Sequence, residues 1–118
     1  MLNVLITGAN RGIGLAITEL ALKRGDKVVA TCRHPSSAKE LIALRAGYSD
    51  RCEIVSLDVM NEDSLHDAAL NIKDHLDLLV CNAGVLNGYG GMMSAENTVD
   101  AFRDVLMTNI ASPFFTTR

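Results

Sequence analysis

A chain of 118 residues is long enough for one compact domain and too short for two. Hydrophobic residues make up 48% of it and charged residues 21%, which is ordinary for a soluble globular protein. Because the formal net charge is only −3 and no basic cluster forms, the composition argues against nucleic-acid binding.

The three cysteines, Cys32, Cys52 and Cys81, form no Cys-x-x-Cys pair and have no His at zinc-ligand spacing. We therefore expect reduced thiols packed as small apolar groups, no metal site and a cytoplasmic protein. The chain starts in a strand-like run without a charged leader, and no apolar run approaches the ~20 residues of a membrane span. We expect a soluble protein with no membrane partner.

The first part of the chain alternates between a strand-like and a helix-like period. Asn3–Thr7 is a short β-like run, and the spacing after it predicts a helix that ends at Gly25. Lys27–Thr31 predicts a second strand. The expected buried face of the helix consists of Ile13, Ala16, Ile17 and Leu20.

The middle of the chain repeats this order. Ser36 or Ser37 is expected to cap a second helix that runs to about Ala46 and stops at Gly47. Glu53–Leu57 predicts a third strand.

A third helix is expected to start at Asn61 or Asp63, and a fourth strand at Leu78–Cys81. Residues 82–93 form a glycine-rich loop, and a last helix is expected from about Ala95. The expected apolar face of the third helix consists of Leu65, Ala68, Ala69, Ile72 and Leu76, and that of the last helix of Val99, Phe102, Leu106 and Ile110.

Repeated strand–helix alternation predicts an α/β domain, a parallel sheet with helices on both faces. Right-handed crossovers place its strands in the order 3-2-1-4, as in a Rossmann-type doubly wound sheet. The whole of residues 1–118 is expected to form this one unit.

The turn after the first strand reads Thr7-Gly8-Ala9-Asn10-Arg11-Gly12-Ile13-Gly14. Glycines in such a turn permit a tight bend, let the backbone approach a pyrophosphate, and let the helix pack close against the sheet. The helix that follows points its unpaired N–H groups at the ligand. The spacing Gly-x-x-x-Gly-x-Gly differs from the common Gly-x-Gly-x-x-Gly fingerprint, and no Gly-Lys-Ser/Thr of a P-loop follows.

This turn resembles the cofactor signature of the short-chain dehydrogenase/reductase family, and three further matches lie at the corresponding elements. Asp58-Val59 follows the third strand, where the family places an Asp against the adenine. Cys81-Asn82-Ala83-Gly84 is similar to the family's Asn-Asn-Ala-Gly, which steadies the sheet and lines the ribose region, although Cys81 replaces the first Asn. Asn109 lies where the family keeps an Asn that supports a proton relay.

The resemblance implies a cofactor site built from several segments of the chain. The expected contacts are Gly8, Asn10, Arg11, Gly12, Ile13 and Gly14 at the pyrophosphate and nearby ribose, Arg33 at a 2′-phosphate, Asp58 and Val59 at the adenine, and Asn82, Ala83 and Gly84 at the ribose and sheet end.

The residues after the second strand favour NADP(H) over NAD(H). An NAD site usually has an Asp or Glu about 20 residues beyond the glycines, and Cys32 occupies the corresponding position here. Arg33 follows it and can bond a 2′-phosphate as a charge-assisted fork, with Arg11 as a second cation. The alternative for each Arg is an ordinary solvated side chain. Asn10-Arg11 and the segment after the second strand also resemble the carbonyl-reductase-like branch, which includes sniffer-type and C-factor-like reductases.

The family's chemistry uses Ser, Tyr and Lys, with Tyr and Lys four residues apart. The only tyrosines here, Tyr48 and Tyr89, start no Tyr-x-x-x-Lys. The resemblance therefore implies a fold truncated before its fifth strand, with Asn109 as the one member of the catalytic set and no turnover by this chain alone. His34, His66 and His75 are expected to be solvated or capping residues.

The leading interpretation is an oxidoreductase that interconverts a small-molecule carbonyl and an alcohol with NADP(H). One alternative is a non-catalytic dinucleotide-binding module, and another is a truncated product without cofactor affinity. A missing fifth strand would leave the fourth strand as an apolar edge and would expose the last helix, including Phe114 and Phe115. We therefore expect association, as a homo-oligomer or through these surfaces.

Overall fold

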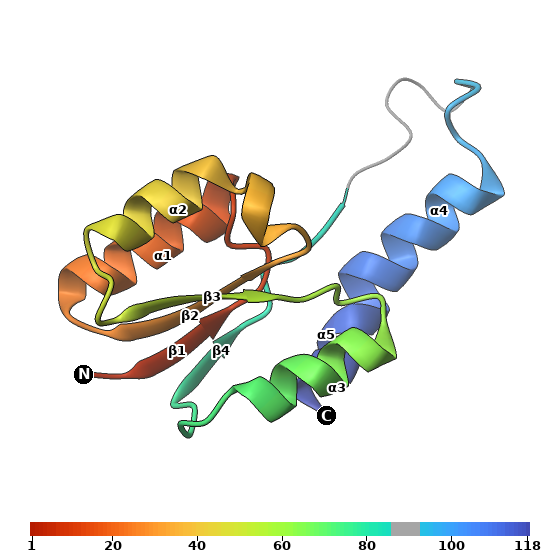
Figure 1. The fold of residues 1–118 in the computed structure, drawn as a ribbon. Coiled ribbons are helices and arrows are strands. Elements are labelled where there is room, and N and C mark those ends of the chain that lie inside the picture. Colours follow the sequence, from red (N-terminus) through yellow and green to blue (C-terminus); the bar gives the residue numbers. More distant parts are fainter. Residues whose placement is uncertain (86–92) are drawn as a thin grey trace.

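The computed structural model describes residues 1–85 and 93–118 of the chain. One sheet of parallel strands forms its centre, in the order β3-β2-β1-β4. The strands are β1 (Asn3–Ile6), β2 (Lys27–Cys32), β3 (Cys52–Ser56) and β4 (Leu78–Val80). Figure 1 shows them side by side with their helical connections. The α/β fold class and the strand order predicted from the sequence are confirmed.

Helices lie on both sides of this sheet. Two of them, α1 (Gly12–Arg24) and α2 (Lys39–Ala46), cover one face, and α3 (Glu62–Asn71) lies against the other (Figure 1). A continuous helical rod ends the chain: it comprises α4 (Val99–Leu106), a π-helical turn η2 (Met107–Ala111) and α5 (Ser112–Thr117). The change of side between α2 and α3 matters for function, because it places a crevice between the carboxyl ends of β1 and β4.

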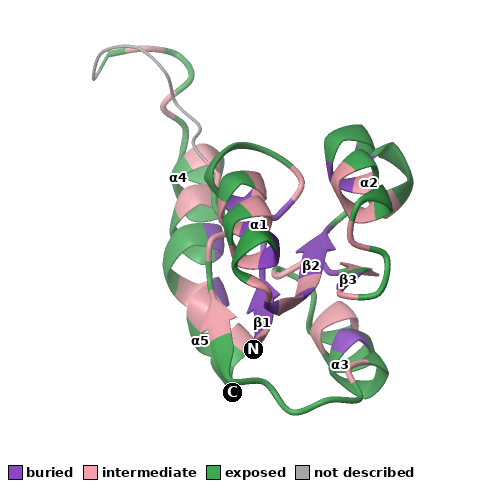
Figure 2. Ribbon diagram, turned by 90° about the vertical axis from the view of Figure 1, so that its left-hand side faces the viewer, coloured by how far each residue is buried: buried purple, intermediate pink, exposed green. Residues whose placement is uncertain are grey.

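The core lies between the first two strands and the α1–α2 layer. Val4, Ile6 and Val28 are almost completely buried in the strands, and Leu22 and Leu41 cover them from the helices. Figure 2 shows this buried band running through β1 and β2. Both faces of these two central strands contribute apolar side chains, as buried parallel strands do.

The predicted buried face of α1 is wrong in part. Ile13 is 73% exposed and Leu20 is 66% exposed, whereas the buried residues of the helix are Gly14, Thr18 and Leu22. The reason lies at the start of the helix, where Gly14 packs against the turn after β1 so closely that no other residue fits. This contact rotates the apolar pattern away from the sheet.

Helix capping confirms one expectation and corrects another. Asn61 caps α3, since its side chain accepts a hydrogen bond from the N–H of Ser64 at 3.0 Å. In contrast, α2 starts after Ala38 without a side-chain cap, so a capping role for Ser36 or Ser37 is wrong. A short 3-10 turn, η1 (Pro35–Ser37), precedes α2 instead, and the hydroxyl of Ser37 donates to the carbonyl oxygen of His34.

Fewer apolar side chains of α3 and β4 are buried than the sequence pattern predicts. Ala68 is the buried residue of α3, and the helix ends at Asn71, so Leu76 of the expected face lies beyond it. Leu78 of β4 is 44% exposed because β4 is the edge of the described sheet.

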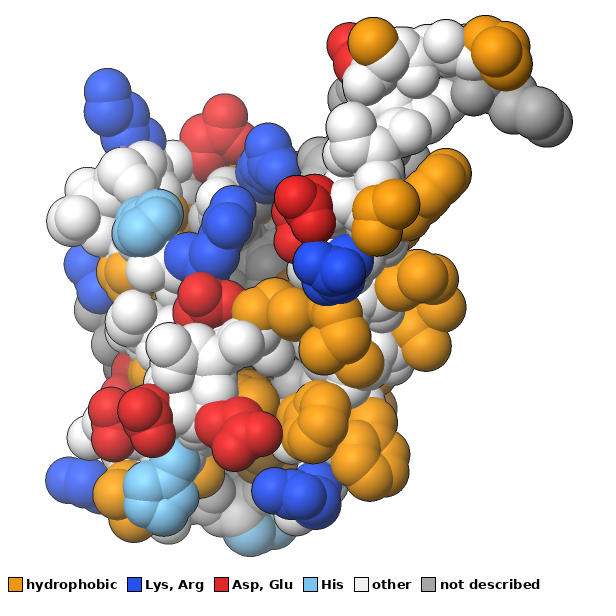
Figure 3. All heavy atoms as spheres, turned by 90° about the vertical axis from the view of Figure 1, so that its right-hand side faces the viewer, with side chains coloured by type: hydrophobic (Ala, Val, Ile, Leu, Met, Phe, Trp, Pro, Cys, Tyr) orange, Lys and Arg blue, Asp and Glu red, His pale blue; other side chains and the backbone are white. Residues whose placement is uncertain are grey.

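The apolar stripe of the last helix faces solvent. The exposed side chains along it are Val99, Phe102, Leu106, Ile110 and Phe114, at 54–74% of their full area. Figure 3 shows hydrophobic side chains gathered over this rod. The rod also elongates the molecule: the radius of gyration is 15.3 Å, against about 13.5 Å for a compact domain of this length.

Candidate cofactor-binding site

A cleft of about 540 Å³ opens at the carboxyl ends of the strands. Four segments of the predicted site meet there: the glycine turn after β1 and the residues that follow β2, β3 and β4. The predicted residues that line it are Gly8, Asn10, Arg11, Gly12, Ile13, Arg33, Asp58, Val59, Asn82, Ala83 and Gly84. Open parallel sheets bind ligands at this position, outside the strand ends and beside the point where the strand order reverses.

The glycine turn has the backbone that its sequence predicts. Gly8 and Gly12 have φ values of 65° and 56°, a region that residues with a side chain rarely adopt. A Cβ at Gly12 would meet no atom within 4 Å, so the backbone here borders open space. The N–H of Ala9 donates to the carbonyl oxygen of Thr31 at 2.9 Å and ties the turn to the end of β2. This open backbone fits a pyrophosphate.

Gly14 is required for a different reason than Gly12. A Cβ at Gly14 would lie 2.1 Å from the carbonyl oxygen of Gly8 and 2.5 Å from the side-chain nitrogen of Asn82. Gly14 does not line the cleft. Its role in the structure is to bring the start of α1 against the turn, which is the helix–sheet contact expected of the last glycine.

Thr7 and Asn82 join β1 to β4 beneath the cleft. The buried hydroxyl oxygen of Thr7 accepts hydrogen bonds from the N–H groups of Asn82 and Ala83, each at 3.0 Å. The side-chain amide of Asn82 donates to the carbonyl oxygen of Gly8 at 3.1 Å. The segment after β4 therefore holds the glycine turn as well as lining the cleft.

Asp58 lies where the chain leaves β3. One carboxylate oxygen accepts the N–H of Met60 at 2.9 Å, and the Asp58 N–H donates to the hydroxyl of Ser64, also at 2.9 Å. These bonds fix the backbone of the segment, and among the described residues the second carboxylate oxygen of Asp58 has no hydrogen bond. An acceptor at this wall of the cleft suits an exocyclic amine.

Two cations line the same cleft as Asp58. Arg11 comes from the glycine turn and Arg33 from the end of β2, and both side chains belong to exposed residues. Neither has an ion-pair partner within residues 1–85 and 93–118. The buried Cys32 stands before Arg33, and burial raises the pKa of its thiol, so it adds no negative charge there. The two unpaired guanidinium groups suit an anionic ligand.

Asn109 lies in the π-helical turn η2 and not in the cleft wall. Its side-chain oxygen accepts the N–H of Val85 and its side-chain nitrogen donates to the Val85 carbonyl, both at 2.8 Å. The same oxygen lies 3.0 Å from the position of a Cβ at Gly84. Asn109 thus anchors the end of the strand-four segment to the last helical rod.

The cleft also contains residues that sequence reasoning did not assign to the site. They are Cys32, His34, Ser37, Leu57, Met60, Val85 and Thr108. Most are immediate neighbours of the predicted motifs, which was the available signal. Thr108 comes from the distant helix η2, and no local pattern indicates it.

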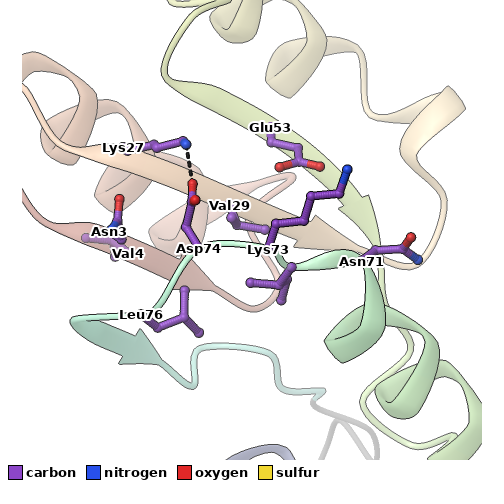
Figure 4. Close-up of a pocket in the computed structure, with 10 residues that line it drawn as sticks. Asn3, Val4, Lys27, Val29, Glu53, Asn71, Lys73, Asp74 and Leu76 are labelled. Atoms are coloured by element: carbon purple, nitrogen blue, oxygen red, sulfur yellow. Dashed lines mark hydrogen bonds and ion pairs between the residues drawn. The ribbon is translucent and has the colours of Figure 1, made fainter.

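A second cavity, of about 300 Å³, lies near the amino ends of the strands. Figure 4 shows Lys27 and Asp74 paired across it, with Glu53 and Lys73 also reaching into it. Its charges are of both signs, and it lies away from the strand ends where ligands of such sheets bind. It is therefore a weaker candidate than the cleft.

Neither a metal site nor a membrane-spanning helix is found in the part of the chain that the structure describes. No group of three or more His, Cys, Asp or Glu residues there could hold a metal ion. No described helix is long and apolar enough to cross a bilayer.

Comparison with known proteins agrees with this geometry. The model of the short chain dehydrogenase family matches residues 2–118. The chain is 32% identical over 116 residues to the short chain dehydrogenase gsfK of Penicillium aethiopicum, covering 94% of this chain and 45% of that protein. It is 35% identical over 113 residues to the 3-oxoacyl-(acyl-carrier-protein) reductase FabG of Vibrio cholerae, covering 93% and 44%.

Among solved structures, the NADPH-bound carbonyl reductase from chicken fatty liver superposes with a TM-score of 0.87 at 32% identity. The match covers 99% of this chain and 49% of that one. The chain thus spans less than half of the length of each of these relatives. From its glycine turn, its strand order and these matches together, the chain belongs to the short-chain dehydrogenase/reductase family of oxidoreductases.

Proposed function

We propose that this chain binds NADP(H) and serves an oxidoreductase that interconverts a carbonyl and an alcohol. The observation that carries the proposal is the cleft itself, which is lined by the glycine turn with its Arg11 and, from the segment after β2, by Arg33. The NADPH-bound carbonyl reductase from chicken fatty liver has the same fold. Its name, and the resemblance of the segment after β2, favour the carbonyl-reductase-like branch for this chain.

The residues of the cleft divide the proposed ligand into parts. The backbone of Gly8 and the open backbone at Gly12, with the N–H groups at the start of α1, would hold the pyrophosphate. Asn10 and Ile13 would border the nearby ribose. Asp58 and Val59 would face the adenine, and the segment from Asn82 to Gly84 the second ribose.

The preference for NADP(H) follows from charge. A carboxylate near the end of β2 would repel a 2′-phosphate, and Cys32 stands there with a protonated thiol. A guanidinium can bond a phosphate through two parallel N–H groups, which Arg33 would do with support from Arg11. NAD(H), which lacks this phosphate, would gain nothing from either cation.

The nicotinamide dinucleotide would supply the hydride. The residues of the cleft would position the nucleotide, and Asn109 would support the proton relay. Asn109 would act from below the cleft, because it holds Val85 and borders Gly84. The π-helical turn η2 around Asn109 departs from regular helical hydrogen bonding, and such turns are frequent at functional sites. The 118 residues contain no Tyr-x-x-x-Lys, so we propose that turnover depends on groups outside them.

A fluorescence titration tests the binding proposal. We expect the chain to bind NADPH more tightly than NADH, and Arg33→Ala to remove most of that preference while leaving NADH binding unchanged. Arg103→Ala is the matched control, because Arg103 makes an exposed ion pair with Asp100 on α4, away from the cleft. Equal affinities for the two nucleotides in the unaltered chain would contradict the NADP(H) assignment.

A turnover assay separates the enzyme from a non-catalytic binding module. The module remains a second candidate because the chain lacks the Tyr-x-x-x-Lys pair. We expect no NADPH oxidation by this chain with aldehyde or ketone substrates, and turnover when the sequence is extended to include such a pair. NADPH binding without turnover even in the extended protein would favour the module.

Association of chains is proposed from the apolar surface of the rod. Phe102, Leu106 and Ile110 form an exposed stripe, and β4 presents an unpaired edge in the described sheet. A homo-oligomer, or association through these surfaces, would cover them. Light scattering of this chain should report a mass above 12.7 kDa. A single monomeric species that unfolds cooperatively would contradict this. A cytoplasmic location remains a prediction from the cysteine composition.

A further inference from the structure

Thr108 is a buried residue of the cleft wall that the binding proposal leaves without a role. It lies in the π-helical turn η2, is 9% exposed, and lines the cleft together with residues that are far from it in sequence. The next residue, Asn109, is bonded to Val85 and borders Gly84, so these contacts hold the turn against the segment after β4. Thr108 therefore belongs to a part of the wall that is fixed before any ligand arrives.

The hydroxyl of Thr108 has no hydrogen-bond partner within residues 1–85 and 93–118. Serine and threonine hydroxyls in helices can bond back to the carbonyl oxygen four residues earlier. Thr18, Ser112 and Thr117 of this chain do so, the first at 2.8 Å. The bond from Ser112 ends on the carbonyl oxygen of Thr108, so the Thr108 backbone is used while its hydroxyl is not.

The position of this hydroxyl follows from two facts about burial. In the described part of the chain, every fully enclosed side-chain nitrogen or oxygen has a hydrogen-bond partner. The Thr108 hydroxyl has none, so it is not enclosed, and it belongs to the small exposed part of the residue. Because Thr108 lines the cleft, the hydroxyl opens into it. An unpaired hydroxyl on a nearly buried residue costs free energy, which a ligand with a matching polar group would recover.

We propose that Thr108 is a further cofactor-binding residue, and that its hydroxyl forms a hydrogen bond with a ribose hydroxyl of the bound dinucleotide. Both groups can donate and accept, so they match in either direction. The turn η2 is tied to the segment after β4, along which the second ribose is proposed to lie. The inference rests on the proposed function and deepens it. NADP(H) and NAD(H) share this ribose, so Thr108 adds affinity for both without discriminating between them.

The first test compares the dissociation constants of NADPH and NADH for the unaltered chain, Thr108→Val and Thr108→Ser. Valine keeps nearly the shape of threonine and removes the hydroxyl. We expect it to weaken the binding of both nucleotides by about fivefold, the effect of one neutral hydrogen bond, and to leave the ratio of the two constants unchanged. Thr108→Ser retains the hydroxyl and should recover most of this affinity. Thr117→Val is the matched control on the same rod, because Thr117 does not line the cleft.

The second test measures urea midpoints in the absence of nucleotide. Because the hydroxyl has no protein partner, Thr108→Val should leave the midpoint unchanged or raise it slightly, whereas loss of a structural hydrogen bond would lower it. A lowered midpoint, or dissociation constants equal to those of the unaltered chain, would overturn the role of Thr108. Binding of neither nucleotide by the unaltered chain would instead overturn the proposed function. The midpoint comparison needs no ligand, so the two failures are distinguishable.

Discussion

The side-chain amide of Asn82 donates a hydrogen bond to the carbonyl oxygen of Gly8 at 3.1 Å. This bond joins the end of β4 to the glycine turn after β1, two segments that are distant in sequence. The same amide nitrogen lies 2.5 Å from where a Cβ at Gly14 would be. The turn, the first helix and the strand-four segment are therefore packed as one unit. We expect a substitution in any of them to destabilise the packing of the other two.

Gly14→Ala should destabilise the fold strongly. The added methyl group would lie 2.1 Å from the Gly8 carbonyl oxygen, which belongs to backbone and cannot move aside without opening the turn. We expect a loss of about 2–3 kcal/mol in the free energy of unfolding, measured by urea denaturation.

Gly47→Ala is the matched control for this change. Gly47 has an ordinary φ of −82°, and its nearest atom to an added Cβ is 3.6 Å away. It should be neutral or stabilising by about 0.5 kcal/mol, because the unfolded chain loses freedom. Equal stabilities of the two variants would contradict the packing of Gly14.

Thr7→Val should separate the hydroxyl's hydrogen bonds from its packing. Thr7 is 2% exposed, and its oxygen accepts two backbone N–H groups, from Asn82 and Ala83. Valine has nearly the same shape but leaves the N–H of Ala83 without its acceptor, while the N–H of Asn82 keeps its bond to the Val80 carbonyl at 3.1 Å. We expect a cost of about 1–3 kcal/mol. Thr7→Ser keeps the oxygen and should lose only about 1 kcal/mol, for the removed methyl group. A serine variant as unstable as the valine variant would show that packing dominates.

Asn109→Ala should loosen the strand-four segment and weaken NADPH binding. It removes both 2.8 Å bonds to Val85, each worth about 1 kcal/mol in net stability. Hydrogen exchange at the Val85 amide is the direct measurement, and we expect it to accelerate. Asn71→Ala controls for loss of a helix amide, since the Asn71 side chain bonds only the Asp67 carbonyl on α3 within residues 1–85 and 93–118. Unchanged exchange at Val85 would contradict the anchoring role.

Stability should fall in acid partly through Asp26. This carboxylate is 4% exposed, and the N–H of Leu2 and the guanidinium of Arg24 hold its pKa below the ordinary value, with the bond from Leu2 as the larger cause. A lowered folded pKa means that its contribution is complete above the ordinary pKa of about 3.9 and disappears as the pH falls through the folded value.

The measurement is the urea midpoint of the unaltered chain minus that of Asp26→Asn, followed from pH 7 down to pH 3. The difference should be constant near neutral pH and shrink below about pH 4. Asp50→Asn, in an exposed turn, should show no such trend. A difference that grows on acidification would reverse the assigned sign of the shift.

Local sequence signals determined the elements and the order of the strands. The turn from Thr7 to Gly14 indicated both a strand–helix junction and its ligand class, because residues other than glycine rarely adopt the backbone found at Gly8 and Gly12. The alternation of apolar periods was sufficient for the parallel sheet, since right-handed crossovers leave few other arrangements. Asn61 as a helix cap was likewise readable from its position before Glu62 and Asp63.

Only the tertiary structure decided which helix faces are buried and which are exposed to solvent. Periodicity places Ile13 and Leu20 on one face of α1, but the close approach of Gly14 to Gly8 turned that face to solvent. The apolar stripe at Phe102 and Leu106 was correctly read as one face, yet what covers it depends on surfaces that no local pattern describes. Contacts between segments far apart in the chain leave no periodic signal, and only the fold brings them together.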